Sequence, residues 1–213
     1  MNNPRLFNRL SGLATLACYT APAVMAAADL ATIALNRNFS PVQESVSKFA
    51  IQPYGWLEKL GMGLIAITFF LIAVNLLALK NDKGLRRLRL AGGFLVVVAV
   101  GFLMIMGFNT NVIGTIVSFH GLVHKISTLA VSVVFYAACL IFMTVMTNRP
   151  GYKFFGLYSG FTFLVGFIIM SLLSLGHYRH EYMGLLERTI ACFNLIWIVL
   201  VGPQVIRLAK SLQ

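Results

Sequence analysis

The sequence predicts an all-α, polytopic membrane protein. Residues 1–213 form a single domain, a bundle of six transmembrane helices with a short amphipathic helix in the first outer loop. Hydrophobic residues make up 59% of the chain and charged residues only 11%. A helix needs about 20 apolar residues to cross the hydrocarbon core. Six stretches meet this requirement: 11–35, 56–79, 89–108, 118–146, 153–175 and 184–209.

The basic residues lie mostly between these stretches, which explains the net charge of +11 without a nucleic-acid partner. One side of the predicted membrane carries eleven of the 17 Lys and Arg residues, and the other side carries the remaining six. Cytoplasmic loops are the richer in Lys and Arg. We therefore expect a multi-pass protein of the bacterial inner (plasma) membrane, with membrane lipids around it and both termini in the cytoplasm.

The first stretch begins like a signal peptide but is long enough to be a span. Arg5 and Arg9 precede it, and Ala26-Ala27-Ala28 resembles a cleavage site. The apolar run continues to Leu35, so we expect the segment to be retained as the first transmembrane helix. Asp29 lies within this span, near its outer end.

The loop 36–55 contains the pattern of a short amphipathic helix over 41–52. Ser40 is the predicted N-cap, Pro41 takes the first helical position and Gln43 the third. Apolar residues recur on one helical face: Val42, Val46, Phe49 and Ala50. Such a helix lies in the outer interface. It either covers the end of the bundle or rests on lipid, and the pattern is compatible with both.

Five of the ten residues in 80–89 are Lys or Arg. The positive-inside bias alone predicts such a cluster, so we interpret it as a topology determinant. The alternative is a site for anionic lipid head groups, which basic residues near the membrane surface attract.

Small residues and proline predict the packing of the later spans. The GxxxG pattern of Gly156 and Gly160, with Gly166 beyond it, predicts a close contact within the chain rather than a dimer. Pro22 and Pro203 predict kinks in the first and sixth spans, because each proline removes a backbone hydrogen bond. Close approach is also expected along the third span, at Gly92, Gly93 and Gly101.

All four histidines lie near the outer ends of spans, and all four are candidate metal ligands. His120 and His124 are four residues apart, so we expect both to face the bundle interior. His177 and His180 flank the loop before the sixth span. Imidazoles in such positions can bind zinc or copper. No motif fixes a third ligand, so we expect less than one equivalent of metal and leave the cofactor open. Heme is not expected, because no histidine lies deep within a span.

Asp29, Glu187 and Arg188 are charged residues within or beside apolar stretches. A carboxylate in such surroundings either becomes protonated or finds a cation. We expect Asp29 to lie within reach of Lys125, Arg188 or His124. One interpretation is a buried ion pair that fixes the register of the helices. The other is a polar pocket for a lipid head group or for acid–base chemistry, with Asp29, His124, Glu187 and Arg188 as candidate catalytic residues.

Several short motifs resemble a known family. The segments Ser45-Val46-Ser47-Lys48-Phe49 and Gln52-Pro53-Tyr54-Gly55-Trp56-Leu57, His120-Gly121-Leu122-Val123-His124, and Gly184-Leu185-Leu186-Glu187-Arg188 followed by Trp197 resemble the bacterial and archaeal membrane family labelled domain of unknown function 998 (DUF998). The resemblance covers roughly residues 10–210 and implies an integral membrane protein of six or seven helices, with no established activity. The matching positions are Pro53, Tyr54, Trp56, His124, Glu187 and Arg188.

Two functional hypotheses follow from these features. The favoured one is an integral inner-membrane protein of unknown activity with a polar cluster at its outer face. It is either a structural or accessory membrane protein or a subunit of a membrane complex, because the loops are short and no catalytic signature is present. The alternative is a membrane-embedded hydrolase or lipid-modifying enzyme with an outer Asp/His/Glu site, with or without a metal. A transporter is disfavoured, since the sequence shows neither an inverted repeat nor a matched pair of broken helices.

Overall fold

The computed structural model describes residues 4–80, 82–111, 116, 118–175 and 181–212. In chain order, its elements are α1 (Pro4–Leu35), α2 (Val46–Phe49), α3 (Trp56–Leu77), the 3-10 turn η1 (Lys83–Leu85), α4 (Arg86–Gly107), α5 (Phe119–Met146), α6 (Lys153–Ser174), α8 (Met183–Leu200) and α9 (Gly202–Ser211). No strand occurs among the described residues. The predicted all-α architecture is confirmed.

Within the described part of the chain, six helical units are long and apolar enough to cross a membrane, as the sequence predicts. Two of them combine neighbouring elements, η1 with α4 and α8 with α9. The sixth unit breaks between α8 and α9 because Pro203, in the first turn of α9, has no backbone N–H to donate to the preceding turn. The sixth span therefore departs from a continuous helix at Pro203, where a kink is predicted, whereas α1 continues as one helix through Pro22.

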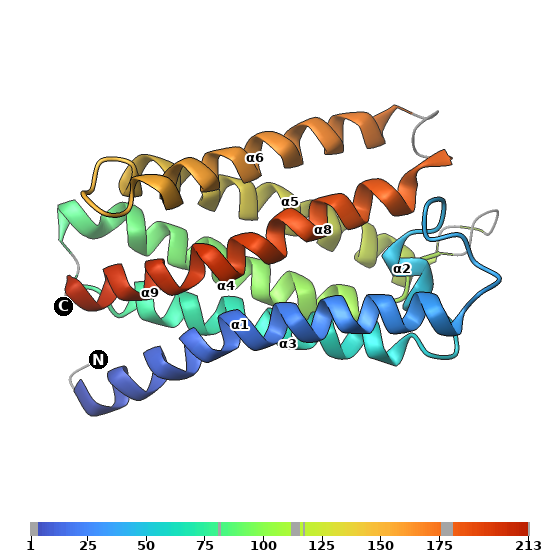
Figure 1. Cartoon of the computed structure of the whole chain (residues 1–213), viewed down its shortest axis with the longest axis horizontal. Helices are drawn as coiled ribbons and strands as arrows, with labels where there is room; N and C mark the ends of the chain where they lie inside the picture. The colour runs from blue at the N-terminus through green and yellow to red at the C-terminus, as the bar shows by residue number, and fades with distance from the viewer. Residues whose placement is uncertain (1–3, 81, 112–115, 117, 176–180, 213) are drawn as a thin grey trace.

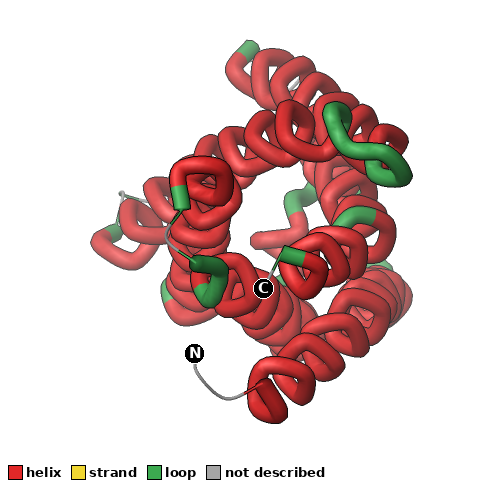
Figure 2. Tube along the Cα trace, turned by 90° about the vertical axis from the view of Figure 1, so that its left-hand side faces the viewer, coloured by secondary structure: helices red, strands yellow, loops and turns green. Residues whose placement is uncertain are grey.

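The six spans pack in chain order around a ring. Each span contacts the next one along the chain, from α1 through α3, α4, α5 and α6 to α8. Helix α1 also contacts α8 and α9, so the first and last spans close the ring when it is viewed end-on (Figure 2). Neighbours in sequence are thus neighbours in space, and the last span adds contacts between distant segments, since α9 packs against α3 as well as α1.

Aromatic side chains fill the middle of the ring. Trp197 of α8 is fully buried, and its indole packs against Phe69 of α3 and against Phe135 and Phe142 of α5. The indole Nε1 donates a hydrogen bond to Ser159 Oγ of α6 at 3.0 Å. Because the polar atom of the indole has a partner, the ring can be buried without leaving a donor unsatisfied. One core therefore joins α3, α5, α6 and α8.

The GxxxG pattern of α6 faces α5, which confirms the intramolecular contact. A Cβ on Gly156 would lie 2.6 Å from the backbone nitrogen of Thr147, and one on Gly166 would lie 2.1 Å from the ring of Tyr136. The close helix approach predicted at Gly93 does not occur, so this prediction is wrong. No atom lies within 4 Å of its Cβ position, because that face of α4 points away from the neighbouring helices.

The two ends of the bundle differ in chemistry. Both chain termini lie at one end, hereafter the terminal end (Figure 1). At the opposite end, hereafter the polar end, α1 finishes, α2 packs, and α3, α5 and α8 begin. Of the six acidic residues in the chain, only Asp82 belongs to the terminal end. The polar end holds the other five, which are Asp29, Glu44, Glu58, Glu181 and Glu187.

Candidate functional site at the polar end

Asp29 and Arg188 form a two-pronged ion pair between the first and last spans. Arg188 Nε donates to Asp29 Oδ2 at 3.0 Å, and Nη2 donates to Oδ1 at 3.0 Å. The Arg188 side chain is only 16% exposed and the Asp29 side chain only 19%. The expectation that Asp29 pairs with a nearby cation is confirmed, and the cation is Arg188. Lys125, the other cation considered, is exposed.

The third nitrogen of the guanidinium binds a loop. Arg188 Nη1 donates to the carbonyl oxygens of Pro41 at 2.8 Å and Glu44 at 3.0 Å. The guanidinium carbon also lies 4.9 Å from the centre of the Phe49 ring, a cation–π distance. We call residues 41–49 the capping segment, because Arg188 holds this stretch over the polar end. One side chain therefore joins α1, α8 and the capping segment.

Glycine at position 184 allows the capping segment to approach α8. A Cβ at this position would lie 2.2 Å from the carbonyl oxygen of Glu44 and 2.4 Å from that of Pro41. The backbone N–H of Leu185 donates to the carbonyl oxygen of Val42 at 3.0 Å. This bond satisfies one of the free N–H groups in the first turn of α8. The loop backbone thus acts as the cap of the last span.

Helix α2 is shorter than the sequence predicts. The predicted helix over 41–52 is reduced to one turn, Val46–Phe49, with Ser45 as its N-cap in place of Ser40. The Ser45 hydroxyl accepts from the N–H of Lys48 at 3.1 Å. The reason for the late start is tertiary. Arg188 takes the carbonyl oxygens of Pro41 and Glu44, which a helix beginning at 41 would need for its own hydrogen bonds.

Glu187 holds the start of α2. Its carboxylate oxygen Oε2 accepts a hydrogen bond from the backbone N–H of Val46 at 2.9 Å, in the first turn of α2. The adjacent residues Glu187 and Arg188 therefore bind the same segment in complementary ways. The carboxylate accepts from the N–H group of Val46, and the guanidinium donates to the carbonyl groups of Pro41 and Glu44.

His124 joins α5 to the capping segment and to the end of α4. Its Nδ1 lies 2.8 Å from the carbonyl oxygen of Phe108, which can only accept, so Nδ1 is the donor. Its Nε2 lies 3.0 Å from Ser47 Oγ. The imidazole is buried, as the sequence predicts for this residue. Both ring nitrogens are already engaged within the protein.

The prediction that His120 faces the bundle interior is wrong. Its side chain is exposed and packs beside the rings of Phe108 and Phe119, at centroid distances of 5.2 and 6.4 Å. His120 lies in the first turn of α5, where the neighbouring Phe119 and Leu122 are exposed as well. At the tip of the bundle, a helical repeat does not guarantee that both members of a pair are covered.

The metal hypothesis stays a prediction. His177 and His180 lie outside the described residues. Within the described part of the chain, no group of three or more His, Cys, Asp or Glu side chains is arranged to hold a metal ion.

Glu58 is a site residue that the sequence analysis did not single out. It lies in the first turn of α3, is fully buried, and interacts electrostatically with both Asp29 and Arg188. Neither carboxyl oxygen accepts a hydrogen bond from a described residue. The sequence did carry a signal, because this acid sits two residues inside an apolar span. We call the group Asp29, Glu58, His124, Glu187 and Arg188 the polar cluster.

Comparison with known families places this geometry in context. The family described as "Protein of unknown function (DUF998)" matches residues 19–203. The chain belongs to this family. The DUF998 match begins within α1 and ends within α9, so the whole polar cluster lies inside it. The searches of curated proteins and of solved structures returned no match.

Proposed function

We propose that this DUF998 protein is a structural or accessory subunit of a membrane complex, in which the polar cluster fixes the shape of one end of the bundle. The observation that carries the proposal is the internal use of the cluster. All three guanidinium nitrogens of Arg188 and both ring nitrogens of His124 have partners within the protein. A general acid or base must reach a substrate. Side chains whose polar atoms already bind a loop and two helices are better suited to a structural role than to catalysis.

The proposal includes the location of the protein. The chain lies in a bacterial inner membrane, with the terminal end in the cytoplasm and the polar end outside. Its support is the distribution of Lys and Arg, since the five basic residues of 80–89 and the pair Arg149 and Lys153 all belong to the terminal end.

Purification from native membranes tests the subunit hypothesis. The tagged chain is extracted in a mild detergent and its mass is measured by native mass spectrometry. A tagged membrane protein of similar size and abundance serves as the control for contaminants. We expect one or more protein partners in fixed stoichiometry with the chain and absent from the control. A lone chain that turns over a lipid substrate would contradict the proposal.

A specific observation favours the second candidate function, a membrane-embedded hydrolase or lipid-modifying enzyme. Glu58 is a buried carboxyl group beside Asp29, and neither of its oxygens accepts a hydrogen bond from a described donor group. An acid in such a place is a candidate for proton transfer. Under this hypothesis, Glu58→Gln abolishes turnover of a lipid substrate while the protein remains folded. Under the subunit hypothesis, the same variant still assembles with its partners.

A further inference from the structure

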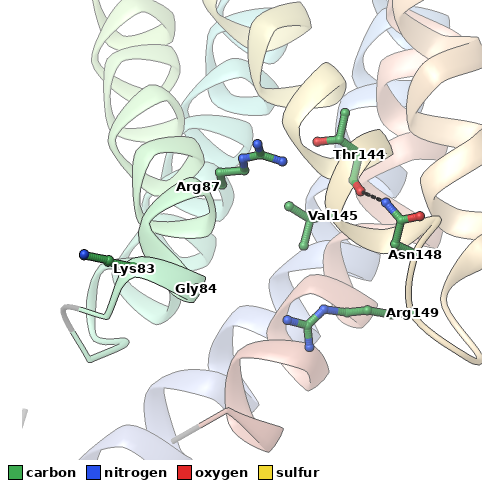
Figure 3. A pocket seen from close by; sticks show the side chains of 7 residues that line it. All are labelled: Lys83, Gly84, Arg87, Thr144, Val145, Asn148 and Arg149. Carbon is green, nitrogen blue, oxygen red and sulfur yellow. Dashed lines mark hydrogen bonds between the residues drawn. The ribbon is translucent and has the colours of Figure 1, made fainter.

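An open groove lies between α4 and α5 at the terminal end, far from the polar cluster. It has a volume of ≈570 Å³ and is lined by Lys83, Gly84, Arg87, Thr144, Val145, Asn148 and Arg149. The basic residues come from two separate regions: Lys83 and Arg87 lie in η1 and the first turn of α4, and Arg149 lies in the connection between α5 and α6. Figure 3 shows the guanidinium groups of Arg87 and Arg149 pointing into the groove from opposite sides, whereas the Lys83 ammonium points away.

No described acidic side chain neutralises this pair. The groove has no acidic residue in its lining, and none of its three cations forms an ion pair with a described residue. Two guanidinium groups that face the same space repel each other unless an anion lies between them. The positive-inside bias requires basic residues on one side of the membrane, but it does not require residues from two separate regions of the chain to converge on one groove.

The start of α4 adds to the positive potential. Arg87 lies in the first turn of this 22-residue helix. That turn contains no acidic residue, and its N-cap, Leu85, makes no side-chain hydrogen bond. The N–H groups and the dipole at a helix N-terminus favour anions. Asn148 uses one amide hydrogen to donate to the Thr144 carbonyl at 2.8 Å, and its second amide hydrogen is available to a ligand.

The position of the groove suits a phosphate group. Leu88 and Met146, next to the groove in sequence, are buried core residues, so the groove lies where the apolar spans end and lipid head groups begin. Arginine forks bind phosphate oxygens through paired hydrogen bonds. We propose that Arg87 and Arg149 bind a phosphate group in this groove, carried either by an anionic lipid or by a soluble phosphorylated molecule.

The test measures binding of phosphatidylglycerol and of inorganic phosphate to the purified full chain. Native mass spectrometry in detergent micelles containing phosphatidylcholine follows a titration with phosphatidylglycerol. Thermal unfolding with phosphate or chloride follows the soluble anion, because a ligand of the folded state raises its stability. The key variant is Arg87→Gln/Arg149→Gln. Its matched control is Arg9→Gln/Lys210→Gln, which removes the same charge from exposed residues at the same end but outside the groove.

We expect the key variant to bind its ligand about 25-fold more weakly, at about fivefold for each basic residue removed. The control variant should stay within about twofold of the unchanged chain. Saturable binding of phosphatidylglycerol that phosphate does not displace identifies a lipid site. Stabilisation by phosphate without retained phosphatidylglycerol identifies a soluble ligand.

A second variant adds charge without removing an arginine. The Cβ position of Gly84 has no neighbour within 4 Å, so Gly84→Glu places a carboxylate in the groove without a backbone clash. This variant should lose binding as well, while unfolding at the temperature of the unchanged chain. Equal losses in the key and control variants would overturn the proposal. So would a chain that neither phosphatidylglycerol nor phosphate binds in preference to phosphatidylcholine and chloride.

Discussion

At the scale of single residues, the guanidinium group of Arg188 has partners in two distant parts of the chain, α1 and the capping segment. It binds the Asp29 carboxylate at two points, two carbonyl groups of the capping segment and the face of Phe49. A lysine could not reproduce this pattern, since an ammonium group lacks the planar fork. The stability of the polar end therefore depends on the pairing of one buried charge.

Two substitutions of Asp29 distinguish the contribution of its charge to stability from that of its hydrogen bonds. Asp29→Leu leaves Arg188 without its counter-charge and should destabilise the protein by about 3 kcal/mol. Asp29→Asn keeps an acceptor for the guanidinium and should cost only about 1 kcal/mol. Thermal unfolding can be followed by the labelling of Cys18 and Cys139, because these free thiols are buried in the folded protein. Cys192 is exposed and would react before unfolding, so the measurement uses a Cys192→Ser background.

Asp82→Leu is the matched control for Asp29→Leu, because it makes the same change at an exposed residue of the terminal end. The control should change stability by less than about 0.5 kcal/mol. Equal effects of the two substitutions would show that the ion pair does not hold the polar end together.

Replacing Glu58 by glutamine should stabilise the protein. The substitution keeps the shape of the side chain and removes a buried acid that lies beside a second carboxyl group. Two carboxyl groups in one buried site repel each other when ionised, and a glutamine amide can donate to the Asp29 carboxylate, so a gain of about 1 kcal/mol is expected. The same thiol-labelling assay measures it. A marked loss of stability would mean that the Glu58 carboxyl has an attractive role in the folded protein.

Part of the polar cluster could be predicted from the sequence. A charge inside an apolar run predicts a partner, and Asp29 and Arg188 are such charges. The contacts of Arg188 with carbonyl groups could not be predicted, because they depend on the path of a loop. The prediction that His120 faces the bundle interior failed for a different reason. Helical spacing predicts that His120 and His124 share a face, but it does not show how far the neighbouring helices extend to cover that face.

At the scale of elements, the capping segment has little regular structure of its own. Its single helical turn is held from outside by Glu187, Arg188 and His124. A four-residue helix is far too short to be stable alone. The predicted helix of 41–52 is cut short because the Arg188 guanidinium donates to the carbonyl oxygens of Pro41 and Glu44, which the longer helix would use for its own hydrogen bonds.

Enlarging Gly184 should release the capping segment. A methyl group in Gly184→Ala would lie within van der Waals distance of two loop carbonyl oxygens, so the segment must move away from α8. We expect faster amide hydrogen exchange at Val46 and Leu185 and a loss of about 1–3 kcal/mol in stability. Hydrogen-exchange mass spectrometry in detergent measures the first effect.

Gly93→Ala is the control for Gly184→Ala, since nothing surrounds the Cβ position of Gly93. Alanine is favoured over glycine inside a helix by roughly 0.5–1 kcal/mol, so this variant should be neutral or slightly more stable. Unchanged exchange in the capping segment of Gly184→Ala would contradict the close approach described above.

At the scale of the whole molecule, the six spans follow from the sequence, because length and apolarity alone define a membrane helix. Short loops between adjacent spans also favour packing in chain order, which the ring displays. What length and hydropathy do not encode is the closure of the ring. That closure depends on specific charges and small residues of α1, α8 and α9.

The orientation of the bundle can be tested by thiol labelling in a cysteine-free background. Asn38 and Lys83 are both exposed and lie near opposite ends of the bundle. Asn38→Cys should react with a membrane-impermeant maleimide in intact cells, and Lys83→Cys only after permeabilisation. The reverse pattern would place the terminal end outside and refute the positive-inside assignment.

Ring closure through the first and last spans has a consequence for biosynthesis. Asp29 enters the membrane with α1, and its partner is made 159 residues later. Until α8 arrives, the carboxyl group lacks this cation, and an acidic group within a membrane span costs about 3 kcal/mol. A chain released before α8 therefore keeps an unpaired acid in its first span, and the finished chain does not. A single carboxylate thus distinguishes complete from incomplete copies of this protein within the membrane.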